Sequence, residues 1–170
     1  MSQSDNMIQR TCFVEIDDAC GVYALSDPGL FLVSGGCSVP LPPQIKKRSK
    51  ASANFTSTLL TACGSVGVFT YDLVHDQHRD YNAVLAVMFS VPFDYNLYSN
   101  WCGAGILNRG TECDKDLFDL MYYGSEMGFV RVKGGAAART FKGEIVEVAV
   151  NITDSSRAVL TVEVKELGRF

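Results

Sequence analysis

Hydrophobic and polar residues alternate along much of the chain, and a period of two is typical of β-strands with one buried face. Near the start, Cys12, Val14 and Ile16 alternate with Phe13 and Glu15. This pattern and the β-branched and aromatic content predict about ten strands. They cover residues 12–16, 21–25, 30–34, 54–62, 65–73, 83–91, 98–107, 129–133, 139–141, 144–151 and 158–164.

Turn signals separate several of these strands. The sequence Ser-Asp-Pro-Gly at 26–29 predicts a turn between the second and third of them. Residues 39–43 contain three of the five prolines, which excludes a central strand there. The basic run at 46–50 could attract anionic lipid or act as a nuclear import signal, but a solvated loop is the favoured interpretation.

One segment, residues 111–123, breaks the alternation and predicts a short amphipathic helix. Thr111 or Asp114 can cap its N-terminus, and acidic residues follow in the first turn. Three apolar residues then recur at helical spacing: Leu117, Leu120 and Met121. Many strands with one packed helix indicate a mainly β fold, a β-sandwich. We expect a short polar N-terminal tail at residues 1–10 and one domain over residues 11–170.

Composition narrows the class of protein. The 170 residues are 47% hydrophobic and 20% charged, which suits a packed core and excludes a disordered chain. The net charge of -4 offers no basic field for nucleic acid. No apolar run reaches the length of a membrane-spanning helix or of a signal peptide. We therefore expect a soluble protein without a signal peptide, which reaches membranes from the surface.

The side chains that carry catalysis or bind metals form no recognisable motif. The six cysteines include no Cys-x-x-Cys pair, and no zinc-ligand spacing can be assembled from them and the two histidines. We expect reduced, mostly buried thiols, no metal and no cofactor. No nucleophile, base and oxyanion site can be assembled either, so an enzyme is not expected.

Aromatic residues concentrate in one polar segment, residues 92–101. Its rings alternate with Asp, Asn and Ser, which is typical of an exposed loop. Amphipathic rings suit a membrane interface, and their faces attract the quaternary ammonium of choline lipids. From these residues alone, a protein–protein patch explains the segment equally well.

At this segment the chain resembles a known family, the actinoporins, which are sea anemone pore-forming cytolysins. The resemblance rests on residues 89–101, on the spacing from there to Tyr122 and Tyr123, and on residues 64–68. Ser34 and Gly35, followed by Pro42, also have counterparts in the family. The chain is most similar to actinoporin-like proteins of fishes, and the resemblance runs from about Thr11 to Val164.

The resemblance implies an actinoporin-like β-sandwich that recognises the phosphocholine headgroup of sphingomyelin and forms homo-oligomers on membranes. The matching headgroup residues are Ser34, Val66, Ser90, Pro92, Tyr98, Tyr122 and Tyr123. The matching membrane-interface aromatics are Phe93, Tyr95 and Trp101. Leu97 stands where the family usually has tryptophan, and Phe118 replaces a tyrosine of the site.

The N-terminal segment differs from the family. Actinoporins insert an amphipathic N-terminal helix as the pore wall, and here residues 1–10 are polar, so we expect this helix to be missing. Headgroup binding is thus expected more than pore formation. A lectin-like module of the same fold, with a glycan as its ligand, is the alternative, and a protein–protein adaptor is a third.

Overall fold

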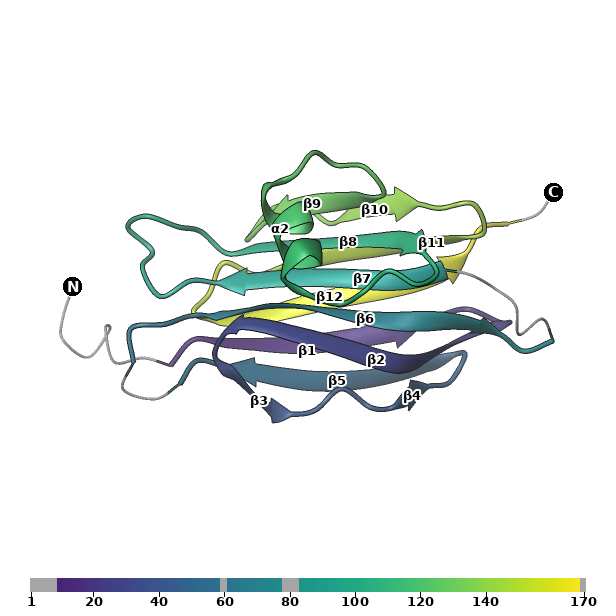
Figure 1. The fold of residues 1–170 in the computed structure, drawn as a ribbon, viewed down its shortest axis with the longest axis horizontal. Coiled ribbons are helices and arrows are strands. Elements are labelled where there is room, and N and C mark those ends of the chain that lie inside the picture. The colour runs from purple at the N-terminus through teal and green to yellow at the C-terminus, as the bar shows by residue number, and fades with distance from the viewer. Residues whose placement is uncertain (1–8, 59–60, 78–82, 169–170) are drawn as a thin grey trace.

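Two six-stranded sheets pack face to face in the computed structural model, which describes residues 9–58, 61–77 and 83–168 (Figure 1). The first sheet has the order β10 (Arg139–Lys142), β11 (Val146–Ile152), β12 (Arg157–Glu166), β1 (Thr11–Asp18), β5 (Ser49–Thr56) and β3 (Gly36–Val39). The second has the order β4 (Gln44–Ile45), β2 (Tyr23–Ser34), β6 (Ser65–His75), β7 (Ala83–Val91), β8 (Trp101–Asn108) and β9 (Phe129–Lys133). The strands pair antiparallel, except that β1 and β12 are parallel.

The main core lies between the two sheets and follows the alternation of the sequence. In β11, Val146, Val148, Val150 and Ile152 are buried, and the residues between them are half-exposed. These side chains meet the inward faces of the second sheet, including Phe89 of β7. The predicted mainly β sandwich is therefore confirmed, with twelve strands in the described part of the chain.

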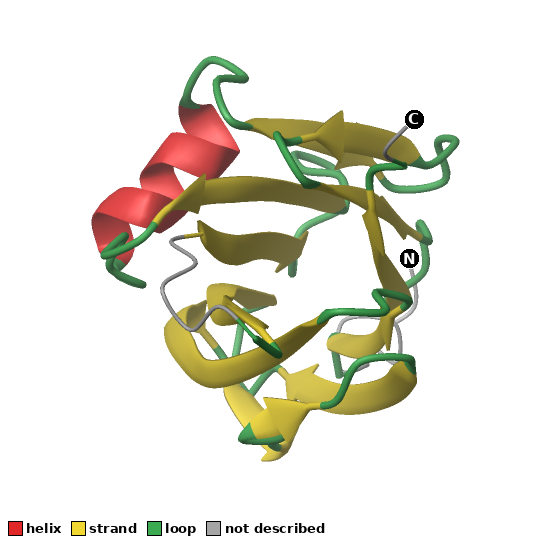
Figure 2. Ribbon diagram, turned by 90° about the vertical axis from the view of Figure 1, so that its right-hand side faces the viewer, coloured by secondary structure: helices red, strands yellow, loops and turns green. Residues whose placement is uncertain are grey.

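Helix α2 (Lys115–Tyr123) lies outside the two sheets, against the second one (Figure 2). Its N-terminus is capped by Asp114, whose carboxylate accepts a hydrogen bond from the Leu117 N–H at 3.0 Å. Leu117, Phe118 and Met121 pack on the outer face of the sheet. This contact explains why β7 is buried on both faces, with no alternation at all. Leu120, predicted on the apolar face, is instead 43% exposed.

Several element boundaries differ from the prediction. Residues 26–29 do not separate two strands: β2 runs through them with a shift in its pairing to β6 between Ser26 and Gly29. The strand predicted at 54–62 is β5, Ser49–Thr56, because its antiparallel pairing with β1 begins at Ser49 and ends at Thr56. The last two residues of the basic run 46–50 therefore belong to a strand. β8 begins at Trp101 rather than at residue 98.

The remaining predictions concern the N-terminal segment, the cysteines and membrane-spanning helices. The predicted polar tail and the missing N-terminal helix fall mostly on residues 1–8, outside the described residues, and the domain limits stay a prediction. Arg10 is described and is only 4% exposed.

All six cysteines are described and none is in a disulfide. No helix in the described ranges is long and apolar enough to cross a membrane.

Candidate functional site

A cavity of about 440 Å³ opens on the outer face of the second sheet, beside α2. Its floor is a row of three residues on adjacent strands: Ser34 pairs with Val66, and Val66 pairs with Ser90. Register partners in an antiparallel sheet point to the same face. The ends of β2 and β7 and the start of β6 thus bring together residues that are far apart in the sequence.

One wall of the cavity is the loop that follows β7. Asp94 organises this loop, since its backbone carbonyl accepts the Tyr98 N–H at 3.0 Å and its carboxylate accepts the Asn96 N–H at 2.9 Å. The turn leaves Tyr98 at the mouth of the cavity with 55% of its surface exposed. Pro92, at the start of the loop, is buried.

The Arg10 side chain holds this loop in place through hydrogen bonds to its backbone. Its Nε donates to the Pro92 carbonyl at 3.2 Å, and its Nη2 donates to the Phe93 carbonyl at 2.8 Å. The guanidinium carbon lies 5.4 Å from the ring centre of Phe93 and 5.1 Å from that of Tyr95, which is cation–π distance. The segment before β1 therefore supports a wall of the cavity.

The opposite wall comes from α2. The Tyr122 ring stacks on Phe118 at 5.5 Å and meets Tyr123 edge-on at 4.7 Å. Burial of Tyr122, and next the neighbouring Tyr123, raise the pKa of its hydroxyl, and Ser90 on the floor opposes this rise. Tyr123 is 75% exposed and stands at the rim. Helical spacing places these rings on the side of α2 that faces the floor.

All seven residues predicted for headgroup binding line this one cavity: Ser34, Val66, Ser90, Pro92, Tyr98, Tyr122 and Tyr123. Of the three predicted interface aromatics, only Phe93 lines it. Tyr95 is half-buried, and its hydroxyl donates to Asn100 Oδ1 at 2.8 Å. Trp101 is half-buried in β8. The most exposed apolar side chain of the loop is Leu97, at 73%. The interface role of the three aromatics stays a prediction.

Several lining residues were missed as site residues by sequence reasoning, including Val33, Cys63 and Asp94. Cys63 is half-exposed, and its Sγ lies 2.9 Å from the Thr61 hydroxyl; this hydrogen bond lowers the pKa of the thiol. Cys63 directly precedes residues 64–68, which resemble the family, and this position in the sequence could have identified it as a lining residue. Ser34 donates to the Gly64 carbonyl at 3.0 Å, which joins this segment to the floor.

The cavity offers rings and hydroxyls rather than charge. Among its described lining residues Asp94 is the sole charged side chain, and no lysine, arginine or histidine is present. Aromatic faces attract a quaternary ammonium, and hydroxyls donate to phosphate oxygens. Within the described residues, no group of three His, Cys, Asp or Glu side chains could hold a metal ion.

Comparisons with known proteins show which proteins this chain is similar to. The family model described as sea anemone cytotoxic protein matches residues 4–166. DELTA-stichotoxin-Hcr4b of Radianthus crispa is 42% identical over 69% of this chain and 63% of its own length. Bryoporin of Physcomitrium patens is 32% identical over 61% of this chain and 55% of its own length. The chain thus spans between half and two thirds of these curated relatives.

A solved structure supports the fold alone. The lipid binding protein Nakanori superposes with a TM-score of 0.68, covering 98% of this chain and 75% of its own, at 12% sequence identity. At that identity the likeness concerns the arrangement of strands and carries no residue roles.

Proposed function

Because the chain belongs to the sea anemone cytotoxic protein family, we propose that it binds the phosphocholine headgroup of membrane lipids in the cavity beside α2. Membership confirms the family resemblance that residues 89–101 indicated. That fishes hold the most similar proteins stays a prediction. The observation that carries the proposal is the convergence of all seven matching residues on one cavity, from three strands, one loop and one helix.

The lining chemistry supports a zwitterionic headgroup. The rings of Tyr98, Tyr122 and Tyr123 can surround a quaternary ammonium at about 0.5–2 kcal/mol per contact. On the floor, the hydroxyl of Ser90 can donate to a phosphate oxygen, whereas Ser34 donates its own proton to the Gly64 carbonyl. Since no cationic side chain is present among the described lining residues, headgroups with net negative charge gain no ionic partner there. Sphingomyelin, which carries phosphocholine, is the lipid that we propose.

We assign the protein a binding role rather than a catalytic one. The described lining residues include no histidine, and the Ser34 hydroxyl on the floor already donates to the Gly64 carbonyl. A nucleophile paired with a general base is therefore lacking among them. Glycan binding in the same cavity is the alternative, and competition by free sugars would detect it.

Vesicle sedimentation tests the proposal. Wild type is mixed with vesicles of sphingomyelin and phosphatidylcholine, or with vesicles of phosphatidylethanolamine and phosphatidylglycerol that lack choline. We expect sedimentation with the first set alone, and competition by free phosphocholine but not by free sugars. Tyr98→Ala should lose binding by about tenfold, as expected for one lost cation–π contact.

The matched control removes an aromatic ring elsewhere. Phe13 lies on β1, is 36% exposed and does not line the cavity, so Phe13→Ala should bind as wild type does. Equal binding to both vesicle sets, or equal losses in both variants, would contradict the proposal. Dye release from the choline vesicles, read in the same samples, would extend it to homo-oligomers that permeabilise the membrane.

A further inference from the structure

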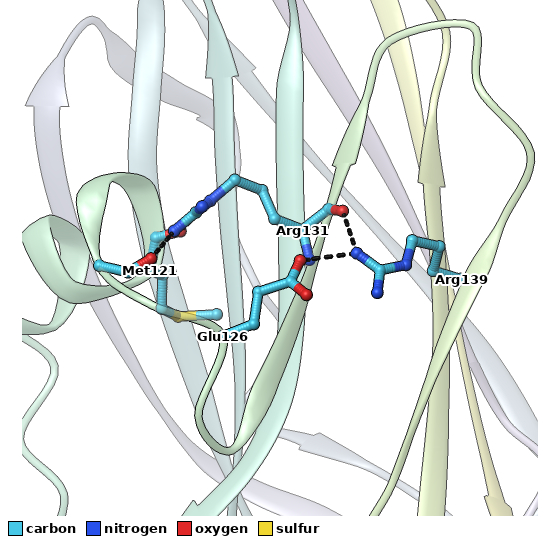
Figure 3. Close-up of polar contacts among 5 residues, drawn as sticks. Met121, Glu126, Arg131 and Arg139 are labelled. Atoms are coloured by element: carbon cyan, nitrogen blue, oxygen red, sulfur yellow. Dashed lines mark hydrogen bonds and ion pairs between the residues drawn. The ribbon is translucent and has the colours of Figure 1, made fainter.

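The C-terminal end of α2 is held by a cation from a neighbouring strand. The last turn of a helix leaves carbonyls without intrahelical donors and attracts positive charge. α2 has no basic residue in its last turn. Arg131 of β9 supplies one instead: its Nε donates to the Met121 carbonyl at 2.8 Å (Figure 3). Its Nη2 donates to the Gly124 carbonyl at 2.7 Å.

Arg131 is itself fixed from two sides. Glu126, in the loop after α2, accepts the Arg131 backbone N–H at 2.9 Å and the Arg139 guanidinium at 2.6 Å (Figure 3). Arg139 also donates to the Arg131 carbonyl at 3.0 Å. The hydrogen bond from Arg139 is the main reason why the pKa of Glu126 is lowered. Because Arg139 belongs to β10 of the first sheet, these contacts tie the end of α2 to both sheets.

The two rings at this end of the helix differ in their other support: Tyr122 stacks on Phe118 and packs on the apolar cluster beneath α2, whereas Tyr123 is exposed. α2 has nine residues, whereas isolated helices shorter than about 12 residues are marginal in water. Its buried contacts are Leu117, Phe118 and Met121, which leaves Tyr122 half-buried and Tyr123 exposed. Without Arg131, the carbonyls of Met121 and Gly124 would lose a charged donor at the turn that carries both tyrosines.

We propose that Arg131, supported by Glu126 and Arg139, is a positioning residue that holds Tyr122 and Tyr123 in the headgroup-binding arrangement. This inference rests on the proposed function. Arg131 is not among the residues that line the cavity, so it acts through the helix end rather than by touching the ligand. Its fork of donors can bond two carbonyls at once, which the ammonium of lysine does with poorer geometry.

Two readouts on the full chain test the proposal. The first is affinity for sphingomyelin vesicles: Arg131→Met should weaken it about tenfold if the tyrosines then occupy the binding arrangement about one tenth of the time. Arg131→Lys should recover part of this loss. The second is amide hydrogen exchange without lipid, where Arg131→Met should speed exchange about tenfold at the C-terminal turn of α2.

Two controls separate positioning from general stability. Val148 is fully buried in β11, away from the site, so Val148→Ala should lower the melting temperature and leave vesicle affinity unchanged. Arg157→Met removes an exposed arginine on β12 and should change neither readout. Equal affinity losses in Arg131→Met and Val148→Ala would overturn the positioning role, as would unchanged exchange at the end of α2. If wild type itself binds no choline vesicle, the proposed function fails, and the exchange result alone decides whether Arg131 holds the helix.

Discussion

The buried carboxyl group of Asp18 predicts that mild acidification stabilises the protein. Asp18 ends β1 and is 0% exposed; its Oδ1 accepts the Cys20 N–H at 3.0 Å, and its Oδ2 has no partner. Burial, reinforced by the nearby charges of Glu166 and Asp17, raises the pKa of this carboxyl from 3.8 to about 6. At neutral pH the fold therefore holds a buried, ionised carboxylate whose charged neighbours Glu166 and Asp17 have the same sign.

The sign of the effect follows from proton linkage. A folded-state pKa above the unfolded value means that the folded state binds the proton more tightly. The contribution of Asp18 to the free energy of unfolding is thus fully present below pH 3.8 and is lost as the pH rises to about 6. About two pKa units at ~1.36 kcal/mol each make this loss about 3 kcal/mol.

Asp18→Asn isolates this contribution, because asparagine keeps an acceptor for the Cys20 N–H and cannot ionise. Urea unfolding measures the free energy of unfolding of both proteins at about pH 4 and about pH 7.5. The value for the variant minus that for wild type should be roughly 2–3 kcal/mol higher at the higher pH, because only wild type loses the contribution of Asp18. Other carboxyl groups titrate in both proteins and cancel in this difference, and the added amide contributes a constant offset. A difference that does not change with pH would refute the reasoning.

Three further predictions concern the loop and the turn around the cavity. Arg10→Met removes the donors to the carbonyls of residues 92–93 and should lower the free energy of unfolding by about 2–4 kcal/mol in urea titrations, with weaker vesicle binding. Gly35 has φ +85 and a Cβ there would meet the Thr56 carbonyl oxygen, so Gly35→Ala should lower the melting temperature by several degrees, about 1–3 kcal/mol. Leu97, 73% exposed, should enter the bilayer, so Leu97→Asp should reduce sedimentation with choline vesicles about tenfold while leaving the melting temperature unchanged.

Local patterning predicted the sandwich because several of its strands, such as β11, alternate buried and half-exposed residues. It failed where pairing overrides local signals. Residues 26–29 have the composition of a turn, yet a shift in register lets β2 absorb them and continue to Ser34. The strand predicted at 54–62 begins at Ser49 because pairing with β1 decides its limits, whatever the charge of the preceding run. Leu120 shares the helical spacing of its neighbours but lies just outside the narrow face that contacts the sheet.

That the seven predicted residues line one cavity was predictable through the family resemblance and not through spacing. Nothing in the sequence places Ser34, Val66 and Ser90 in one row, since that follows from the register of three strands. The contacts of Arg131 and Arg10 leave no motif either. Their partners are largely backbone carbonyls, which every residue carries, so only the folded chain reveals which ones are reached.

Titration of the isotope-labelled protein with free phosphocholine, followed by NMR amide shifts, tests the central claim most directly. It needs no membrane and therefore separates headgroup recognition from insertion or assembly. We predict saturable shifts at Ser34, Val66 and Ser90 and at Tyr122 and Tyr123, and none on the outer face of β1 around Phe13. An unchanged spectrum at saturating phosphocholine, or shifts that avoid the cavity, would contradict the assignment of the site.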